Sequence, residues 1–284
     1  MSANSSSPAM AAVTAQIAVG PSGVAYRTFG RAGARPLVLF QRFRGTMDDW
    51  DPDLLDRLAA ERQVTIFDSL GIGRSEGQTP DSIAGMAQAA GDVIDALGIA
   101  NADILGWSLG GTVAQQLCLD RPWLVRRAIV AGSSPGGVAD APKAPDKVWQ
   151  VATKPVNDDE DFLYLFFHDT ETSKAAGHAH LGRLKRRGGP ASPPVGPEAI
   201  RAQLGAIGAW AMGNGSALPR LGEIPHPIFV ANGQFDRMIP AYNSFVMGQR
   251  LPNAKLSLYP DSGHAFLFQH AAEFARDALA FLGD

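Results

Sequence analysis

The sequence predicts an α/β fold, in which a mostly parallel central β-sheet is flanked by helices and interrupted by an inserted helical segment. Short runs of mainly apolar residues, such as 37–40 and 64–67, alternate along the chain with stretches of helical periodicity. Such runs are typical of strands that are buried on both faces of a parallel sheet. The alternation stops near residue 138 and resumes near residue 227. Alternating strands and helices favour parallel pairing through right-handed crossovers, so we interpret the interruption as an insertion.

An antiparallel hairpin is expected at the start of the sheet. Residues 13–19 and 23–29 alternate apolar with small or polar residues on either side of a Gly-Pro-Ser-Gly turn at 20–23, which is a hairpin pattern. Residues 1–12 contain neither a basic leader nor a sustained apolar run. They are therefore expected to form a flexible N-terminus and not a secretory signal.

Apolar runs and helical patterns predict the remaining elements of the sheet domain. The helix near residue 82 is expected to begin at an N-cap formed by Asp81 or Ser82. The expected strands lie at 37–40, 64–67, 104–105, 128–130, 227–230 and 256–259, and the expected helices at about 53–61, 82–97, 109–120, 242–251 and 271–282.

Residues 138–220 differ in composition from the rest of the chain. They are rich in Pro, Lys, Arg and Asp, contain an aromatic cluster at 162–167 and have no solid strand-like run. We interpret them as a helical cap inserted into a core domain that comprises residues 13–137 and 221–284.

Charge and cysteine content exclude several classes of function. The 284 residues include 25 basic and 28 acidic side chains, a formal net charge of -3, so no excess positive charge is available for a nucleic acid or an anionic membrane surface. No stretch approaches the ~20 consecutive apolar residues that span a bilayer. The single cysteine, Cys118, cannot form an intramolecular disulfide, which favours a reducing, cytoplasmic location. The expected partner is a small-molecule substrate, and both a monomer and a homodimer remain open.

A candidate nucleophile, Ser108, follows the strand that contains residues 104–105. It is the centre of the pentapeptide Gly-Trp-Ser-Leu-Gly at 106–110. Between a buried strand and a helix this pattern indicates a nucleophile elbow, where flanking glycines let the strand and the helix approach each other. A glycine-rich turn with an incidental serine would give the same pentapeptide.

A serine nucleophile needs a base and an orienting carboxylate, and the chain offers both at strand ends. His264 follows the strand at 256–259, and Asp236 follows the strand at 227–230. The order Ser, Asp, His is that of an elbow on an α/β sheet. Taken together, Ser108, Asp236 and His264 are predicted to form a catalytic triad.

With these residues in place, the sequence resembles the α/β-hydrolase superfamily over nearly the whole chain except the insertion. The segments 37–46, 67–75, 106–110, 233–240 and 262–264 are similar to landmarks of that family in the same order. The resemblance implies an α/β-hydrolase fold with a helical cap. It also implies an oxyanion hole formed by the backbone N–H groups of Phe43 and Leu109, although Gln41-Arg42 and Arg44 stand where the family usually has His-Gly and often a proline.

Arg42 and Arg44 flank the proposed oxyanion loop and allow two interpretations. They either bind a substrate carboxylate or pair with Asp48, Asp49 or Asp51 and brace the loop.

Aromatic side chains near the cap are candidates for an apolar substrate wall, while most of them are expected to form the core of the cap itself. The candidates are Trp107, Trp149, Phe166, Trp210 and Phe266.

No cofactor or metal ion is expected. The glycines at 71, 73 and 77 have the wrong spacing for a dinucleotide fingerprint. His168, His178 and His180 include a His-x-His step that could hold zinc, but no cysteine supports the set.

The predicted activity is that of a serine hydrolase that cleaves a small apolar carboxylic ester or lactone through an acyl-enzyme. The same triad resembles those of carbon–carbon bond hydrolases and cofactor-free perhydrolases. A serine at position 108 argues against dehalogenase and epoxide hydrolase chemistry, which proceeds through an aspartyl ester in this superfamily. A ligand-binding receptor with little turnover is the alternative of another class.

Overall fold

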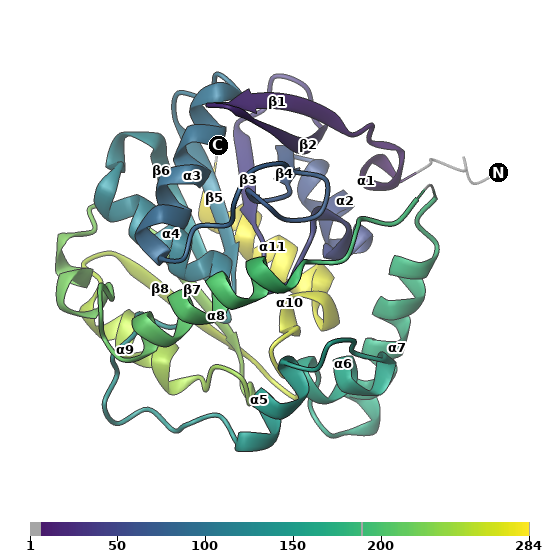
Figure 1. Cartoon of the computed structure of the whole chain (residues 1–284). Coiled ribbons are helices and arrows are strands. Elements are labelled where there is room, and N and C mark those ends of the chain that lie inside the picture. Colours follow the sequence, from purple (N-terminus) through teal and green to yellow (C-terminus); the bar gives the residue numbers. More distant parts are fainter. Residues whose placement is uncertain (1–6, 189, 284) are drawn as a thin grey trace.

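The computed structural model describes residues 7–188 and 190–283, and these residues form an eight-stranded sheet between two helical layers (Figure 1). The strand order is β1-β2-β4-β3-β5-β6-β7-β8. β1 pairs antiparallel with β2, and β2 with β4, whereas all the other neighbouring strands are parallel. The strands are β1 Ala15–Val19, β2 Ser22–Gly30, β3 Pro36–Phe40, β4 Gln63–Phe67, β5 Ala102–Trp107, β6 Val125–Ala131, β7 Ile228–Gly233 and β8 Ala254–Tyr259. This confirms the predicted fold class.

Alternate side chains of the central strands enter two separate hydrophobic cores. In β3, Leu37 and Leu39 lie in the core on one face of the sheet, and Val38 and Phe40 lie in the core on the other. Successive side chains of a strand point to opposite faces, so a strand covered on both sides must be mainly apolar. This requirement explains why the solid apolar runs located the strands.

Helices cover both faces of the sheet. The core that contains Leu37 is closed by α1, α2, α10 and α11, and the opposite core by α3, α4 and α9. Ser82 caps α3, because its side chain accepts the N–H of Gly85 at 3.1 Å. These helices are α1 Pro8–Ala11, α2 Pro52–Ala59, α3 Ile83–Ala96, α4 Leu109–Asp120, α9 Tyr242–Arg250, α10 Phe266–Gln269 and α11 Ala271–Leu282.

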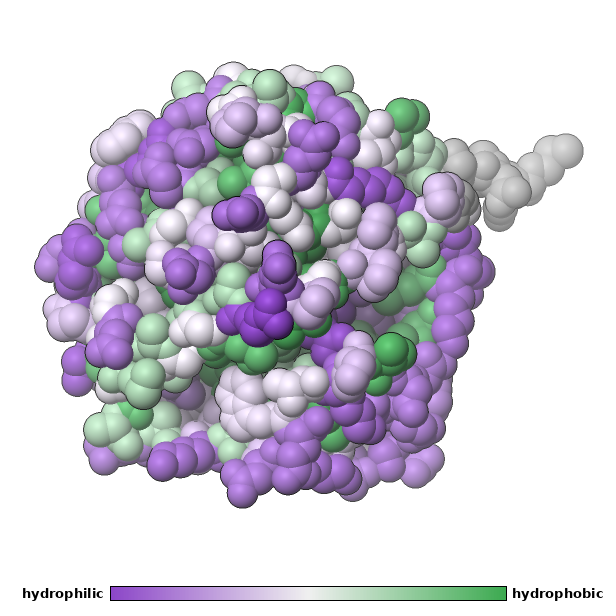
Figure 2. All heavy atoms as spheres, viewed as in Figure 1, coloured by the Kyte–Doolittle hydropathy of each residue, from purple (hydrophilic) through white to green (hydrophobic). Residues whose placement is uncertain are grey.

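Four further helices lie between β6 and β7 in the chain, in the region predicted to be a cap. α8 crosses in front of the sheet in Figure 1, and α5, α6 and α7 lie along its lower and right side. In the space-filling view, α7 turns hydrophilic residues outward at the right edge, while polar and apolar residues are interspersed over the rest of this face (Figure 2). The four helices are α5 Asp146–Ala152, α6 Asp159–Phe166, α7 Glu171–Lys185 and α8 Pro197–Ala211.

The N-terminal segment differs in part from the flexible start that the sequence suggested. Residues 1–6 of that segment lie outside the described residues. Residues 8–11 form the short helix α1, in which Ala9 is buried and donates its N–H to Asp56 Oδ1 at 2.9 Å. Within the described part of the chain, no helix combines the length and apolarity needed to cross a bilayer.

Candidate active site

The three predicted triad residues come from the carboxyl ends of three parallel strands. Ser108 follows β5, Asp236 lies in the loop after β7, and His264 lies after β8. Ser108 has φ 57° and ψ −119°, in the left-handed region that a non-glycine residue rarely adopts. The strain persists because its N–H is held by Ala131 O at 2.9 Å and α4 begins directly after it.

The glycines around Ser108 are required by close approach. A Cβ atom on Gly106 would lie 2.2 Å from the carbonyl oxygen of Gly110, and one on Gly110 would lie 2.1 Å from the carbonyl oxygen of Phe40. No side chain fits at such distances, so only glycine lets β3, β5 and the first turn of α4 meet here.

His264 and Asp236 are buried and joined to each other. Nδ1 of His264 lies 2.6 Å from Oδ2 of Asp236, and Oδ1 of Asp236 accepts the N–H groups of Met238 and Ile239 at 2.8 and 2.9 Å. The carboxylate is thus fixed by the backbone while it orients the imidazole. The indole N–H of Trp107 donates to the carbonyl oxygen of His264 at 3.0 Å, which fixes the backbone of the histidine as well.

The second imidazole nitrogen has no such partner. Nε2 of His264 is buried without a hydrogen bond to any described residue, and the Ser108 hydroxyl makes no capping hydrogen bond to α4. Both residues line the same cavity of about 640 Å³ between the core and the cap. With Nδ1–H directed at Asp236, the free Nε2 is the nitrogen that remains to accept a proton.

The two predicted oxyanion donors are both available. Phe43 lines the cavity that contains Ser108, and Leu109 is the first residue of α4. Among the described residues neither backbone N–H has an acceptor, as expected for Leu109 because the first N–H groups of a helix have no intrahelical partner. Gln41, which replaces the usual histidine, shapes the loop by accepting the N–H of Arg42 at 2.8 Å and donating to Thr46 O at 3.0 Å.

The two arginines of this loop have different surroundings, although both line the cavity. Arg44 makes no ion pair with Asp48, Asp49 or Asp51. Its guanidinium donates to cap carbonyl oxygens, namely those of Ala152 at 3.0 Å, Lys154 at 2.7 Å and Pro155 at 3.0 Å.

Arg42 pairs with one of the three aspartates that the bracing interpretation named, and it also contacts the backbone of the loop. One Nη donates to Phe43 O at 2.8 Å, and the other lies 3.1 Å from Asp49 Oδ1. Burial lowers the pKa of Arg42, and the carboxylate of Asp49 opposes that shift.

The aromatic candidates fall into two groups. Phe166 lines the cavity, and Trp107 lies behind it, with the rings of both centred less than 6 Å from the His264 ring. The interpretation of the other three as a substrate wall is corrected by their positions. Trp149 is 43% exposed, Trp210 is buried against Ser134 O, and Phe266 is buried between Tyr259 and Phe274, and none of them lines the cavity.

Sequence reasoning did not assign several residues to the site. Phe162, Leu165 and Met238 line the cavity, and Gln203 of α8 accepts the N–H of Arg44 at 3.0 Å. For Phe162 a signal existed, because it precedes Phe166 by four residues and such a pair shares one helix face. Nothing in the sequence distinguished Gln203 from other helical glutamines.

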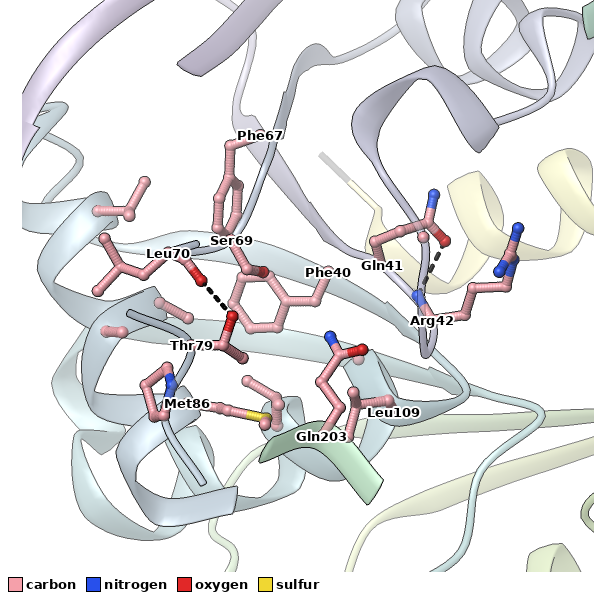
Figure 3. Close-up of a pocket in the computed structure, with 17 residues that line it drawn as sticks. Phe40, Gln41, Arg42, Phe67, Ser69, Leu70, Thr79, Met86, Leu109 and Gln203 are labelled. Carbon is pink, nitrogen blue, oxygen red and sulfur yellow. Dashed lines mark hydrogen bonds between the residues drawn. The ribbon is translucent and has the colours of Figure 1, made fainter. Parts of the chain in front are cut away.

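A second, smaller hollow of about 40 Å³ lies beside the loop that contains Gln41 and Arg42 (Figure 3). Phe40, Leu70, Met86, Leu109 and Gln203 are among the residues that line this hollow (Figure 3). Neither Ser108 nor His264 lines it. Its volume gives room for roughly three water-sized groups.

Two histidines of the cap, His168 and His180, contact residues of the core domain. Among the described residues, no group of three or more His, Cys, Asp or Glu side chains is placed to hold a metal ion. His168 stacks on Phe235 at 4.1 Å between ring centres, and Nδ1 of His180 lies 2.7 Å from Oδ2 of Asp51 in the core domain. Arg183, one turn further along α7, donates to the same carboxylate.

Comparison with known proteins identifies the family of the fold. The family model described as alpha/beta hydrolase fold matches residues 35–271, which include all three strand-end residues. The chain belongs to the α/β-hydrolase fold family.

Several known proteins are similar to this chain over most of its length. An alpha/beta hydrolase fold protein from Chitinophaga pinensis superposes with a TM-score of 0.90 at 38% identity, covering 98% of this chain and 99% of that one. The 2-hydroxymuconate semialdehyde hydrolase of Pseudomonas putida is 31% identical over 80% of this chain and 79% of its own. The poly(3-hydroxyalkanoate) depolymerase of Ectopseudomonas oleovorans is 25% identical over 89% and 86%.

Proposed function

We propose that this α/β-hydrolase is a serine hydrolase that cleaves a small, largely apolar carboxylic ester or lactone through an acyl-enzyme. The observation that carries the proposal is the contact of 2.6 Å between His264 Nδ1 and Asp236, which leaves a buried Nε2, without a partner among the described residues, in the cavity of Ser108. This is the arrangement that a base needs to activate a hydroxyl nucleophile.

The proposed reaction has two halves. Ser108 Oγ attacks the carbonyl carbon while His264 Nε2 accepts the hydroxyl proton, and the backbone N–H groups of Phe43 and Leu109 stabilise the oxyanion. His264 then returns the proton to the leaving alcohol. In the second half His264 activates a water molecule, which attacks the acyl-enzyme and releases the acid.

A fluorophosphonate probe tests the proposal directly. Wild-type protein is expected to gain the mass of the probe less HF at Ser108, because the hydroxyl displaces fluoride, and Ser108→Ala is expected to gain none. His264→Ala is expected to react far more slowly, because the hydroxyl then has no base. A folded wild-type protein that stays unlabelled would contradict the proposal.

Cleavage of a carbon–carbon bond is a second candidate, which the 31% identity to a 2-hydroxymuconate semialdehyde hydrolase favours. The same three side chains would serve both reactions. A screen of esters, lactones and vinylogous diketones against wild type and Ser108→Ala distinguishes the two reactions. Binding of these compounds without any Ser108-dependent turnover would instead indicate a receptor.

A further inference from the structure

Arg42 places a cation next to the proposed reaction centre. It lines the cavity of Ser108 and His264, and its guanidinium carbon lies 5.0 Å from the ring centre of Phe166 and 5.8 Å from that of Trp107. These are the two rings that pack against His264. The guanidinium and the imidazole therefore share the same aromatic neighbours.

The hydrogen bonds of this guanidinium are incomplete. Besides Phe43 O, its acceptor is Asp49, whose carboxylate also accepts the N–H and the hydroxyl of Thr46 at 2.7 and 2.9 Å. The Nε of Arg42 is buried and has no acceptor among the described residues. Buried donors are almost always paired, so this N–H lacks the usual partner. The Arg42 side chain is 12% exposed and lines the cavity, so a ligand there would meet an incompletely paired guanidinium.

The other charged groups around the cavity are more fully occupied. Arg44 donates hydrogen bonds to the three cap carbonyls. Lys185 pairs with Asp159 at 2.5 Å, and Asp48 accepts hydrogen bonds from Arg27 and Arg74 at 2.6 and 2.8 Å.

Arg187 also lines the cavity, and its Nε has no acceptor within residues 7–188 and 190–283, but its guanidinium lies toward Asp48 at 3.4 Å and Trp50 O at 3.2 Å. Arg42 is thus the cation that combines an unpaired donor with the aromatic neighbours of His264.

We propose that Arg42 binds an anionic group of the substrate, so that the protein selects esters or lactones that carry a carboxylate close to the scissile carbonyl. The inference rests on the proposed hydrolase function. A guanidinium matches the two oxygens of a carboxylate, and the Phe162 and Phe166 rings in the same cavity suit an otherwise apolar skeleton. Arg44, by contrast, holds the loop to the cap.

Matched pairs of substrates test the assignment. For an acid on the acyl side, kcat/KM is measured for 4-nitrophenyl hemiglutarate and for 4-nitrophenyl valerate, which has the same carbon chain without the acid. For an acid on the leaving group, 4-carboxyphenyl acetate is compared with phenyl acetate. The quantity that decides is the acidic-to-neutral ratio within each protein variant.

Wild type is expected to prefer the acidic member of at least one pair. In Arg42→Gln the ratio for that pair is expected to fall about 10- to 100-fold, the range for one hydrogen bond to a charged group. Arg42→Lys keeps the positive charge but loses the planar guanidinium that can donate two parallel hydrogen bonds, so it should restore part of the ratio. Arg44→Gln, the matched change two residues away, should leave the ratio unchanged.

A purely structural role of Arg42 would lower both members of a pair equally, and an unchanged ratio in Arg42→Gln overturns the inference. A ratio that falls in Arg187→Gln but not in Arg42→Gln overturns it too. If wild type hydrolyses neither ester, the proposed function fails separately. Calorimetric binding of the same pairs to Ser108→Ala, with and without Arg42→Gln, then decides the assignment of Arg42 without turnover.

Discussion

At the scale of single residues, both carboxylate oxygens of Asp236 make hydrogen-bond contacts. Oδ2 contacts Nδ1 of His264, and Oδ1 accepts two backbone N–H groups. An amide at this position has the right shape, but only one of its two ends can accept hydrogen bonds.

Asp236→Asn is therefore expected to fold and to lose most of the activity. In one orientation the NH₂ group of the amide would donate to Nδ1 of His264, which would leave the imidazole proton on Nε2. In the other orientation the NH₂ group would face the two backbone N–H donors that the carboxylate accepts. A wrong tautomer in a serine triad lowers kcat by about 10⁴-fold. Steady-state ester hydrolysis measures the loss, circular dichroism checks the fold, and the exposed Asp81→Asn serves as the control. Near wild-type kcat in folded Asp236→Asn would argue against a role for this carboxylate.

The elbow glycines give a second prediction at this scale. Gly106→Ala would place a methyl group 2.2 Å from the carbonyl oxygen of Gly110, so strand and helix would have to separate. We expect a loss of more than about 3 kcal/mol in the free energy of unfolding, or no soluble protein.

Gly205→Ala provides the control, because the helix α8 leaves open space at that position. This change should be neutral or should stabilise the protein by up to about 1 kcal/mol. Urea unfolding of the two variants makes the comparison. Equal stability of Gly106→Ala and Gly205→Ala would contradict the close approach.

At the scale of elements, the helix α7 is tied to the core through Asp51, the N-cap of α2. Its carboxylate contacts His180 and Arg183 of α7 and is fully buried. Burial by itself would raise the pKa of Asp51, but the hydrogen bonds from His180 and Arg183 outweigh it and hold the pKa below its usual range.

This lowered pKa sets a direction for pH dependence. The folded state binds the proton of Asp51 more weakly than the unfolded state, so the contribution to stability is present above a pH of about 4 and is lost as the pH falls further. Asp51→Asn is expected to lower the melting temperature at neutral pH, and the difference from wild type should shrink toward pH 3. Asp53→Asn, in an exposed pair with Arg57, should change the melting temperature little at either pH. A difference that grows on acidification would contradict the sign.

Elements and site were predictable to different degrees. The strand β3 was found because burial on both faces makes its run wholly apolar, whereas in β5 only Ile104 and Leu105 gave that signal, next to the buried Asp103 that pairs with Arg126. Strand order in an α/β fold brings Ser108, Asp236 and His264 to one edge. Which aromatic faces the cavity depends on how each helix rotates against its neighbours. Trp210 turns away because its indole reaches Ser134 O, a contact across 76 residues that no local pattern encodes.

At the scale of the whole molecule, the two cores share one sheet, so the fold is expected to open as a unit. Cys118 lies in α4, fully covered, and burial raises the pKa of its thiol to about 12. The thiolate is the reactive form, and native protein should hardly contain it.

Labelling with a disulfide reagent is therefore expected to be slower by orders of magnitude in the native protein than in urea. Its rate across a denaturant series should follow the loss of helical signal in circular dichroism. Since the sequence contains one cysteine, the readout is specific to this site. Rapid labelling of the native protein would mean that α4 opens locally.

The hydrogen bonds of Arg44 to the cap couple the opening of the cap to the position of the loop that carries Phe43. The loop that carries Phe43 is held by Gln203 of α8 and by carbonyls of residues 152, 154 and 155. Lifting the cap at these points would release the same loop that holds one of the two proposed oxyanion donors. An opened molecule would thus admit compounds to Ser108 while its catalytic geometry was incomplete. Substrates that bind tightly enough to keep the cap closed would be hydrolysed, and weakly bound esters would mostly dissociate unreacted.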